Sequence, residues 1–447
     1  MIRIVFFTAL ILLFMWPRTF FISLVGTGVS PFTFVAFLML ILSFYLLVIS
    51  RDVQDTFIVS LKSGASAVGL TLLFWGWRFL SDFFGINSGI SLKADALELF
   101  YFGSWFFTGI IMFTHQGSPK TLERVLIITV IGSFLVALFE AITGQSFITA
   151  VGANDAMAGD AYRANLATTI TERDGVARLK SLFSHPIVFG SIIGALAPLA
   201  VHKLIHRSEG GIIVATILAI CIFQSIILAN ARTSYVVLAI SLASYCVLYI
   251  VNLKRFSGII AGTMILLGSP IYIPAAIVEV NAISSGRNAD ESRSTQARAM
   301  QANMALAAAS TRPISGFGTG MAIDVAGIQP QGRSFKTIDN YYLNMVVDYG
   351  YIGLASFSML LICYIIVGVG AIHSANSPSD RSLLCVVVSA IFGLSASFFA
   401  VSINDALSWI FLFAGYIVAR KGRDRLEIRA SFADLARRRG DSQAQAT

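Results

Sequence analysis

Charged residues are scarce in this chain of 447 residues. Asp, Glu, Lys and Arg make up 13% of it, where a soluble domain carries roughly a quarter. Hydrophobic residues make up 56%, and the mean hydropathy is +0.78. So little polar surface cannot cover a soluble globule, and the long apolar runs are typical of membrane-spanning helices. The composition therefore predicts an all-α, polytopic membrane helix bundle.

Cysteine is also scarce, and the usual cofactor motifs are missing. All four cysteines lie inside apolar runs, which excludes a disulfide framework and a metal-ligand spacing; they are Cys221, Cys246, Cys363 and Cys385. The stretch SGFGTG at 315–320 resembles a phosphate loop, but no Lys follows it and no strand precedes it. We interpret it as a hinge, and we expect neither a metal nor another cofactor.

The excess of positive charge is concentrated near the C-terminus. The net charge is +8, and residues 420–440 hold eight of the 32 Lys and Arg residues. Such a run is typical of a basic juxtamembrane helix on the cytoplasmic face. We therefore expect no nucleic-acid partner.

About twelve apolar runs are long enough to cross a membrane, since a span needs roughly 20 apolar residues. The first, 4–24, is expected to kink or end at Pro17. The predicted spans are 4–24, 31–50, 64–84, 95–113, 122–143, 187–205, 211–229, 234–252, 257–277, 340–371, 382–401 and 404–420.

Lys and Arg favour one side of this arrangement. If the N-terminus is inside, the short inner loops and the tail hold most of the positive charge, as the positive-inside rule requires. Both termini are then cytoplasmic. The predicted regions are five spans (1–143), an outer loop (144–186), four spans (187–277), a large outer loop between spans nine and ten (278–338), three spans (339–420) and a basic tail (421–447).

The large outer loop contains one predicted helix near 294–310. Ser294 and Thr295 are suited to begin it, and Ala297, Met300, Met304 and Ala307 would share an apolar face. Such a helix suits a position on the bilayer surface or over a cavity.

Two arginines lie at predicted outer ends of spans. Arg178 precedes span six, and Arg232 occupies the tight turn between spans seven and eight. Either residue alone is also explained by a side chain that reaches lipid phosphates. Their common side favours a shared anion, because guanidinium groups bind phosphate in a bidentate way.

The stretch IDNYYLNMVVDYGYIGL (338–354) places an acid at the start of a predicted membrane helix. On one regular helix, Gly350 and Gly353 would share the face of Asp339 and let a neighbouring helix approach closely. Asp339 would then face the bundle, as an N-cap or as a chemical group. Asp348 points the opposite way, and we expect it to pair with an arginine.

Several motifs together resemble the O-antigen ligase and Wzy-type polysaccharide polymerase superfamily. They are ALFEAITGQSF, RLKSLFSHPIVFG, NARTSY, TRPISGFGTG, and DN followed by nine residues and GYIG. The ligase signature is His, then Asn, Ser or Gln, nine residues, and Gly-x-x-Gly. Asn340, Gly350 and Gly353 match it, whereas Asp339 stands where the histidine is expected.

The resemblance implies a metal-independent, inverting glycosyltransferase of the bacterial inner membrane, with a periplasmic active site. Arg178 and Arg232 would hold the diphosphate of an undecaprenyl-linked oligosaccharide, and Asp339 would be the base. The missing histidine favours a polymerase of exopolysaccharide or O-antigen repeats. A flippase and a chain-length regulator are possible partners. Supporting or glycan-binding candidates are Arg293, Arg298, Arg312, Glu140, His185 and Asn340.

Two other functions stay open. A ligase would pass a finished glycan to a lipid or protein acceptor. A flippase or transporter of lipid-linked oligosaccharide would also place cations in a membrane cavity, but the long loops on one side and the missing internal repeat speak against it.

Overall fold

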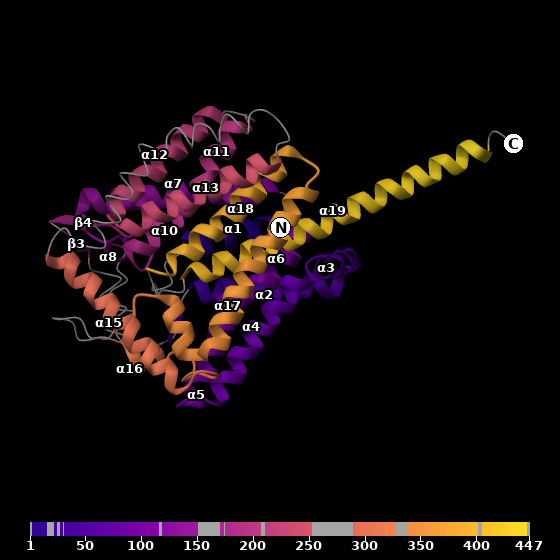
Figure 1. Cartoon of the computed structure of the whole chain (residues 1–447). Helices are drawn as coiled ribbons and strands as arrows, with labels where there is room; N and C mark the ends of the chain where they lie inside the picture. Colours follow the sequence, from indigo (N-terminus) through magenta and orange to yellow (C-terminus); the bar gives the residue numbers. More distant parts are fainter. Residues whose placement is uncertain are drawn as a thin grey trace.

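The computed structural model describes residues 2–15, 22–24, 27–29, 31–115, 119–150, 170–173, 175–206, 211–252, 289–327, 336, 338–400 and 405–444. These residues form a helical bundle with two short two-stranded sheets (Figure 1). Among them, seven helices are long and apolar enough to cross a membrane, or eight if one bent pair is a single span. The structure thus confirms the polytopic helical class. The predicted span 257–277 lies outside the described residues.

The helix of the first predicted span ends just before Pro17. Helix α1 (Ile2–Met15) ends two residues before Pro17, and strands β1 (Ile22–Leu24) and β2 (Thr27–Val29) pair as an antiparallel hairpin. Of the two expected outcomes, an end or a kink at Pro17, the structure thus has the end, and the helix does not continue to residue 24. Proline cannot continue a helix interior, because it lacks the N–H donor and clashes with the preceding turn.

The next helices form a sharp corner. Helix α2 (Pro31–Ile49) meets α3 (Arg51–Ser63) at 106°. The Ser50 hydroxyl caps α3 by accepting the Val53 N–H. Helix α4 (Ala65–Phe83) follows and packs against α17. The predicted span 95–113 belongs to a longer helical run of α5 (Ser88–Glu98), the π-helix η1 (Leu99–Gly103) and α6 (Ser104–His115).

The middle of the chain holds helices that pack through small residues. In order they are α7 (Pro119–Thr143), α8 (Phe147–Ala150), strands β3 (Thr171–Arg173) and β4 (Val176–Arg178), α10 (Pro186–Ala195), α11 (Pro198–Ile205), α12 (Gly211–Ala229) and α13 (Arg232–Asn252). A side chain at Gly190 would collide with Ser234, and one at Gly393 with Ser241. These glycines let α10 and α18 approach α13 closely.

The C-terminal part contains an outer helix and three long helices. These are α15 (Ala289–Thr311), α16 (Ala322–Ala326), α17 (Tyr341–Ser374), α18 (Pro378–Ser397) and α19 (Asp405–Ala444). The prediction of a helix at 294–310 is thus confirmed, although the helix begins at Ala289 and not at Ser294 or Thr295. Its predicted apolar face is exposed at Met300 and Met304, and the buried face contains Gln301, Ala305 and Ala309.

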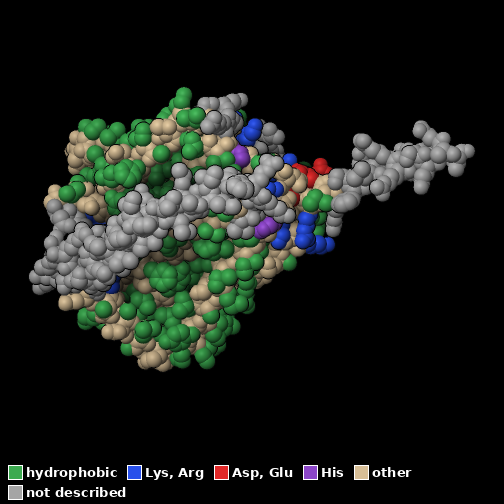
Figure 2. All heavy atoms as spheres, turned by 45° about the horizontal axis from the view of Figure 1, so that its top comes forward, with side chains coloured by type: hydrophobic (Ala, Val, Ile, Leu, Met, Phe, Trp, Pro, Cys, Tyr) green, Lys and Arg blue, Asp and Glu red, His purple; other side chains and the backbone are tan. Residues whose placement is uncertain are grey.

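Charge separates the two ends of the molecule. Helix α19 is roughly 60 Å long at 1.5 Å per residue and projects far beyond the bundle (Figure 1). Hydrophobic side chains cover much of the face in Figure 2, whereas charged and His side chains gather mainly where α19 leaves the body.

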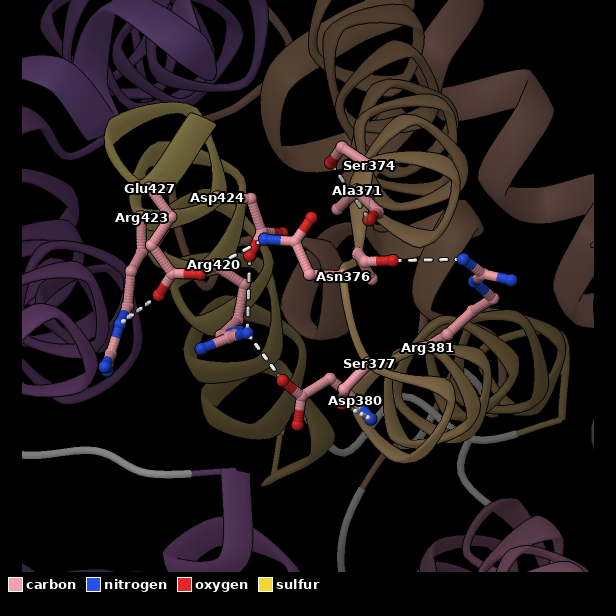
Figure 3. A network of polar contacts seen from close by, with 11 residues as sticks. Ala371, Ser374, Asn376, Ser377, Asp380, Arg381, Arg420, Arg423, Asp424 and Glu427 are labelled. Atoms are coloured by element: carbon pink, nitrogen blue, oxygen red, sulfur yellow. Dashed lines mark hydrogen bonds and ion pairs between the residues drawn. The ribbon is translucent and has the colours of Figure 1, made fainter. Parts of the chain in front are cut away.

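A polar network ties α19 to the loop before α18 at this charged end (Figure 3). Arg420 Nη2 lies 2.8 Å from Asp380 Oδ2 and 3.4 Å from Asp424 Oδ1. The Asn376 amide donates to Glu427 Oε2 at 3.1 Å. We call this end of the bundle the charged end, and the opposite end the outer end.

Candidate functional site

Contacts between helix ends bring most of the predicted site residues to the outer end. The Leu179 N–H donates to the Leu228 carbonyl at 3.0 Å, which places β4 beside the turn before Arg232. The Tyr341 N–H donates to the Phe398 carbonyl at 2.8 Å, so the start of α17 meets the end of α18. Since α13 packs along α18, Arg178, Arg232 and Asp339 all belong to the outer end.

The segment that follows Arg178 is held by a buried acid, Glu140. Its Oε2 accepts the backbone N–H groups of Lys180 at 3.2 Å and Ser181 at 2.8 Å, and its Oε1 accepts the Phe147 N–H at 3.1 Å. Ser181 has a positive φ of 54°, and its hydroxyl donates to the Ser133 carbonyl at 2.7 Å. Glu140 therefore fixes the backbone next to Arg178.

Three cations lie in this region, and we call Arg178, Lys180 and Arg232 the arginine site. Both arginines are half-buried, and Arg232 begins α13. Lys180 is buried, and burial lowers the pKa of its ammonium group to about 8, opposed by the charge of Glu140. Half-buried cations at a helix N-terminus can attract an anion such as a phosphate. No sequence pattern distinguishes Lys180 from the other basic residues of its loop.

Asp339 lies just before α17 and is exposed, so the prediction that it occupies a packed, bundle-facing stripe was wrong. The N-cap is Asn340, whose Oδ1 accepts the Leu343 N–H at 3.2 Å. The Asp339 N–H donates to Oε1 of the buried Gln301 on α15 at 3.2 Å. The outer helix therefore contacts the backbone of the candidate base.

The glycine prediction also needs correction, because α17 is broken at Gly350. This residue has φ 70° and ψ −174°, a backbone conformation that suits glycine. A side chain there would collide with the Ile314 carbonyl, which belongs to a loop and not to a neighbouring helix. At Gly353 the obstacle would be Tyr349 of α17 itself. The assumed regular helix does not exist at this point.

The loop that fills the break is firmly bound, and so it does not have the expected features of a hinge. The N–H groups of Phe317 and Gly318 donate to the carbonyls of Val347 and Asp348, each at 2.9 Å. The Asp348 carboxylate accepts the N–H groups of Gly320 and Ala322 at 3.2 and 2.7 Å. Among the described residues, Asp348 thus binds backbone amides, where we had expected an arginine.

Two side chains fasten the same loop to α4. Thr319 donates its N–H at 2.8 Å and its hydroxyl at 2.9 Å to the buried Asp82 carboxylate. The Arg312 guanidinium donates to the Phe84 carbonyl at 2.8 Å and covers the Phe317 ring, which assigns it an anchoring role. We call Asp82, Arg312, Thr319, Asp348 and Gly350 the loop clamp.

Sequence reasoning missed a buried ion cluster beside this clamp. Arg78 lies inside α4 and is fully buried. Its Nη2 is 2.6 Å from both Asp95 Oδ1 and Glu98 Oε2, and its guanidinium lies 4.5 Å from the Trp75 ring centroid and 4.6 Å from that of Tyr349. The three-residue spacing of Asp95 and Glu98 was the available signal, since it puts both acids on one helix face.

The remaining candidates are a helix cap and two arginines of α15. His185 caps α10, and its Nδ1 accepts the Ile187 N–H at 3.2 Å. Arg298 is exposed on α15, and the side chain of Arg293 lies outside the described residues. Within the described part of the chain, no group of three or more His, Cys, Asp or Glu side chains is placed to hold a metal ion.

The fold and the outer end define a polytopic helical membrane protein whose half-buried arginines suit an anionic ligand. Residues 215–358 match the family model described as O-antigen ligase. This match begins in α12, includes Arg232, α15, the looped segment 312–319 and Asp339, and ends in α17 after the break at Gly350. The match supports a relation of this part of the chain to the O-antigen ligase and Wzy-type polymerase superfamily. No curated protein matches the chain.

Proposed function

We propose that the protein polymerises oligosaccharide repeat units carried on undecaprenyl diphosphate, at the periplasmic face of the bacterial inner membrane. The observation that supports this most is that the segments carrying Arg178, Arg232 and Asp339 lie at one end of the bundle. A diphosphate needs cations, and an acceptor hydroxyl needs a nearby carboxylate or other base. The aspartate at position 339, in place of the ligase histidine, favours polymerisation over ligation.

In the proposed reaction, an acceptor sugar hydroxyl attacks the anomeric carbon of the donor glycan. The new glycosidic C–O bond forms as the anomeric carbon–diphosphate bond breaks, and the configuration inverts. Asp339 receives the hydroxyl proton, and undecaprenyl diphosphate leaves with the bonding electrons. Arg178 and Arg232 stabilise the negative charge that grows on the leaving diphosphate. The product is a lipid-linked chain that is longer by one repeat block.

The orientation follows from the charge distribution. Lys and Arg gather where α19 leaves the body (Figure 2), and the positive-inside rule assigns such an end to the cytoplasm. The outer end then faces the periplasm, where a flippase would deliver the substrate and a chain-length regulator would act on the product.

Substitution of the arginines tests this function directly. We expect Arg232→Ala to lower the polymerisation rate by about 10²–10³-fold, as for loss of one charge-stabilising donor, whereas Arg232→Lys keeps part of the activity. The assay uses purified protein in detergent with radiolabelled lipid-linked repeat units, and it reads polymer length on a gel. Lys93→Ala, at an exposed cation of α5, is the matched control. Polymer of normal length from Arg232→Ala would overturn the diphosphate role.

The same assay separates the alternatives. Asp339→Asn keeps the side-chain shape and should lower the rate about 10²-fold, and a wild-type rate would leave Asp339 without chemistry. Polymer formation in detergent needs no sealed vesicle, so it excludes a pure flippase. Single-block transfer of preformed glycan to another acceptor, without chain growth, would indicate a ligase.

A further inference from the structure

The segment 341–349, which begins α17, folds back along the rest of this helix. Tyr341 and Phe357 lie on opposite sides of the break at Gly350 and would be roughly 24 Å apart on one regular helix. The centroids of their rings are only 5.5 Å apart, and those of Tyr342 and Phe357 are 5.9 Å apart. The start of α17 therefore lies beside the second helical turn after the break, and not at the end of a straight helix.

The fold-back places the start of α17 against the C-terminal end of α18. The Tyr341 N–H donates to the Phe398 carbonyl at 2.8 Å, and the Tyr342 hydroxyl donates to the Ser395 carbonyl at 2.9 Å. The Tyr342 ring is half-buried, and its centroid lies 4.5 Å from that of Phe399. The Phe399 side chain is 66% exposed. We call Tyr342 and Phe399 the aromatic platform.

Asp339, the candidate base, lies next to the aromatic platform. It precedes Tyr341 by two residues, so the two backbone positions are at most about 7 Å apart, and the Asp339 side chain is exposed. An exposed carboxylate is costly in hydrocarbon, and this favours water over lipid tails around it. Phe399 therefore presents an aromatic ring to an aqueous surface beside an acid.

This combination of groups suits a sugar better than a lipid chain or a free phosphate. One face of a pyranose ring presents C–H groups with a partial positive charge, which match the negative face of an aromatic ring. The hydroxyl groups at its rim can donate to a carboxylate. A hydrocarbon chain has no donor for the acid, and a phosphate would be repelled by it.

We propose that Tyr342 and Phe399 form a stacking platform for the acceptor sugar, which presents its attacking hydroxyl to Asp339. The proposal rests on the proposed function, in which Asp339 receives the proton of that hydroxyl. It adds a binding role for the turn after α18, and it gives the fold-back at Gly350 a purpose, because only this geometry brings the start of α17 to that turn.

The experiment measures binding of the oligosaccharide repeat unit, released from its lipid carrier and radiolabelled, to purified protein in detergent. We expect Phe399→Leu to raise the Kd from equilibrium dialysis by about 3–10-fold, and Phe399→Trp to keep it within about twofold of the wild type. Leucine keeps an apolar contact for lipid but offers no aromatic face. The tryptophan emission of Phe399→Trp should also shift when the oligosaccharide is added, relative to wild-type protein.

Two controls accompany these variants. Phe44→Leu, at a phenylalanine of α2 that is 67% exposed, should leave the Kd unchanged. Binding of sugar-free undecaprenyl diphosphate should stay at the wild-type level in all three variants. A wild-type Kd in Phe399→Leu, or an equal rise in Phe44→Leu, would overturn the platform. Equal losses in Phe399→Leu and Phe399→Trp, together with lost carrier binding, would also overturn it by showing a structural role.

Failure of the platform and failure of the proposed function can be told apart. Normal polymer from Phe399→Leu, with an unchanged Kd, would overturn the platform and leave the polymerase function intact. Oligosaccharide binding that weakens in Phe399→Leu and persists in Phe399→Trp would support the platform even if the wild-type protein made no polymer from lipid-linked repeat units. That last result would contradict polymerisation alone.

Discussion

Arginines in two regions of the outer half have different surroundings. Arg78 is fully buried and has two carboxylates within 2.6 Å and two aromatic rings against its guanidinium. Arg178 and Arg232 are half-buried, and the contacts that hold their surroundings are backbone bonds, such as those from Lys180 and Ser181 to Glu140. The comparison suggests that Arg78 serves the fold, whereas Arg178 and Arg232 are partly exposed and lie beside a backbone segment that Glu140 holds in place.

Removal of Arg78 should give the largest loss of stability. Arg78→Ala leaves Asp95 in a buried site without its counter-ion, which costs about 3–5 kcal/mol, so we expect little folded protein after extraction into detergent. The measurement is the thermal midpoint and the monodisperse yield. Arg78→Met combined with Asp95→Leu should recover part of the loss, because the only acid that then lacks Arg78 is Glu98, which is partly exposed. A wild-type thermal midpoint for Arg78→Ala would contradict the structural role of Arg78 and would group it with Arg178 and Arg232.

Substitution of Gly350 should have the next largest effect, because it breaks the loop clamp. Ala at this position adds a strained positive φ and a collision with the Ile314 carbonyl, and positive-φ strain alone costs about 1–3 kcal/mol. Gly320→Ala is the matched control, since Gly320 has φ 80° and no atom near a new side chain. Thermal midpoints should fall more for Gly350→Ala than for Gly320→Ala. Equal midpoints would show that the loop at Ile314 shifts to accommodate the new side chain at little cost in stability.

Glu140 is a buried acid, as Asp95 is beside Arg78, but it holds the backbone of the arginine site. Glu140→Ala leaves the N–H groups of Phe147, Lys180 and Ser181 without their acceptor, and each unsatisfied buried group costs about 1–3 kcal/mol. We expect a lower thermal midpoint together with weaker binding of sugar-free undecaprenyl diphosphate. Glu140→Gln keeps an acceptor oxygen and should retain most of both. Loss of stability with unchanged carrier binding would separate Glu140 from the arginine site.

The membrane class and most helix positions could be predicted from the sequence, because apolar runs and helical periodicity are local signals. The helix around residues 294–310 and the start of α17 after Asn340 are examples. Contacts distant in sequence could not be predicted in this way. The face assigned to Asp339, Gly350 and Gly353 assumed one regular helix, and a loop more than 30 residues earlier in the chain breaks it. The ion pairs of Arg78 could not be predicted for a similar reason, since its partners lie on another helix.

The smallest predicted effect concerns Asp424, a buried acid at the charged end. Asp424 lies in the tail region beyond the predicted last span, and burial raises the pKa of its carboxyl group to about 6, although Arg420 opposes the shift. Because the folded pKa exceeds the ordinary value of 3.8, the folded state binds the proton more tightly. Stability should therefore rise as the pH falls from about 7 towards 4.

Comparison with Asp424→Asn isolates this contribution from other titrating groups. The wild-type midpoint should gain on that of the variant by the equivalent of about 1 kcal/mol as the pH is lowered through 6. The effect is small because Arg420 also pairs with Asp380 at 2.8 Å. Arg420 therefore keeps a carboxylate partner when Asp424 is neutral. If the thermal midpoint of the wild type instead falls below that of Asp424→Asn as the pH is lowered, Arg420 stabilises the charged Asp424 carboxylate. Asp424 would then be a paired, ionised acid, as Asp95 and Glu98 are beside Arg78.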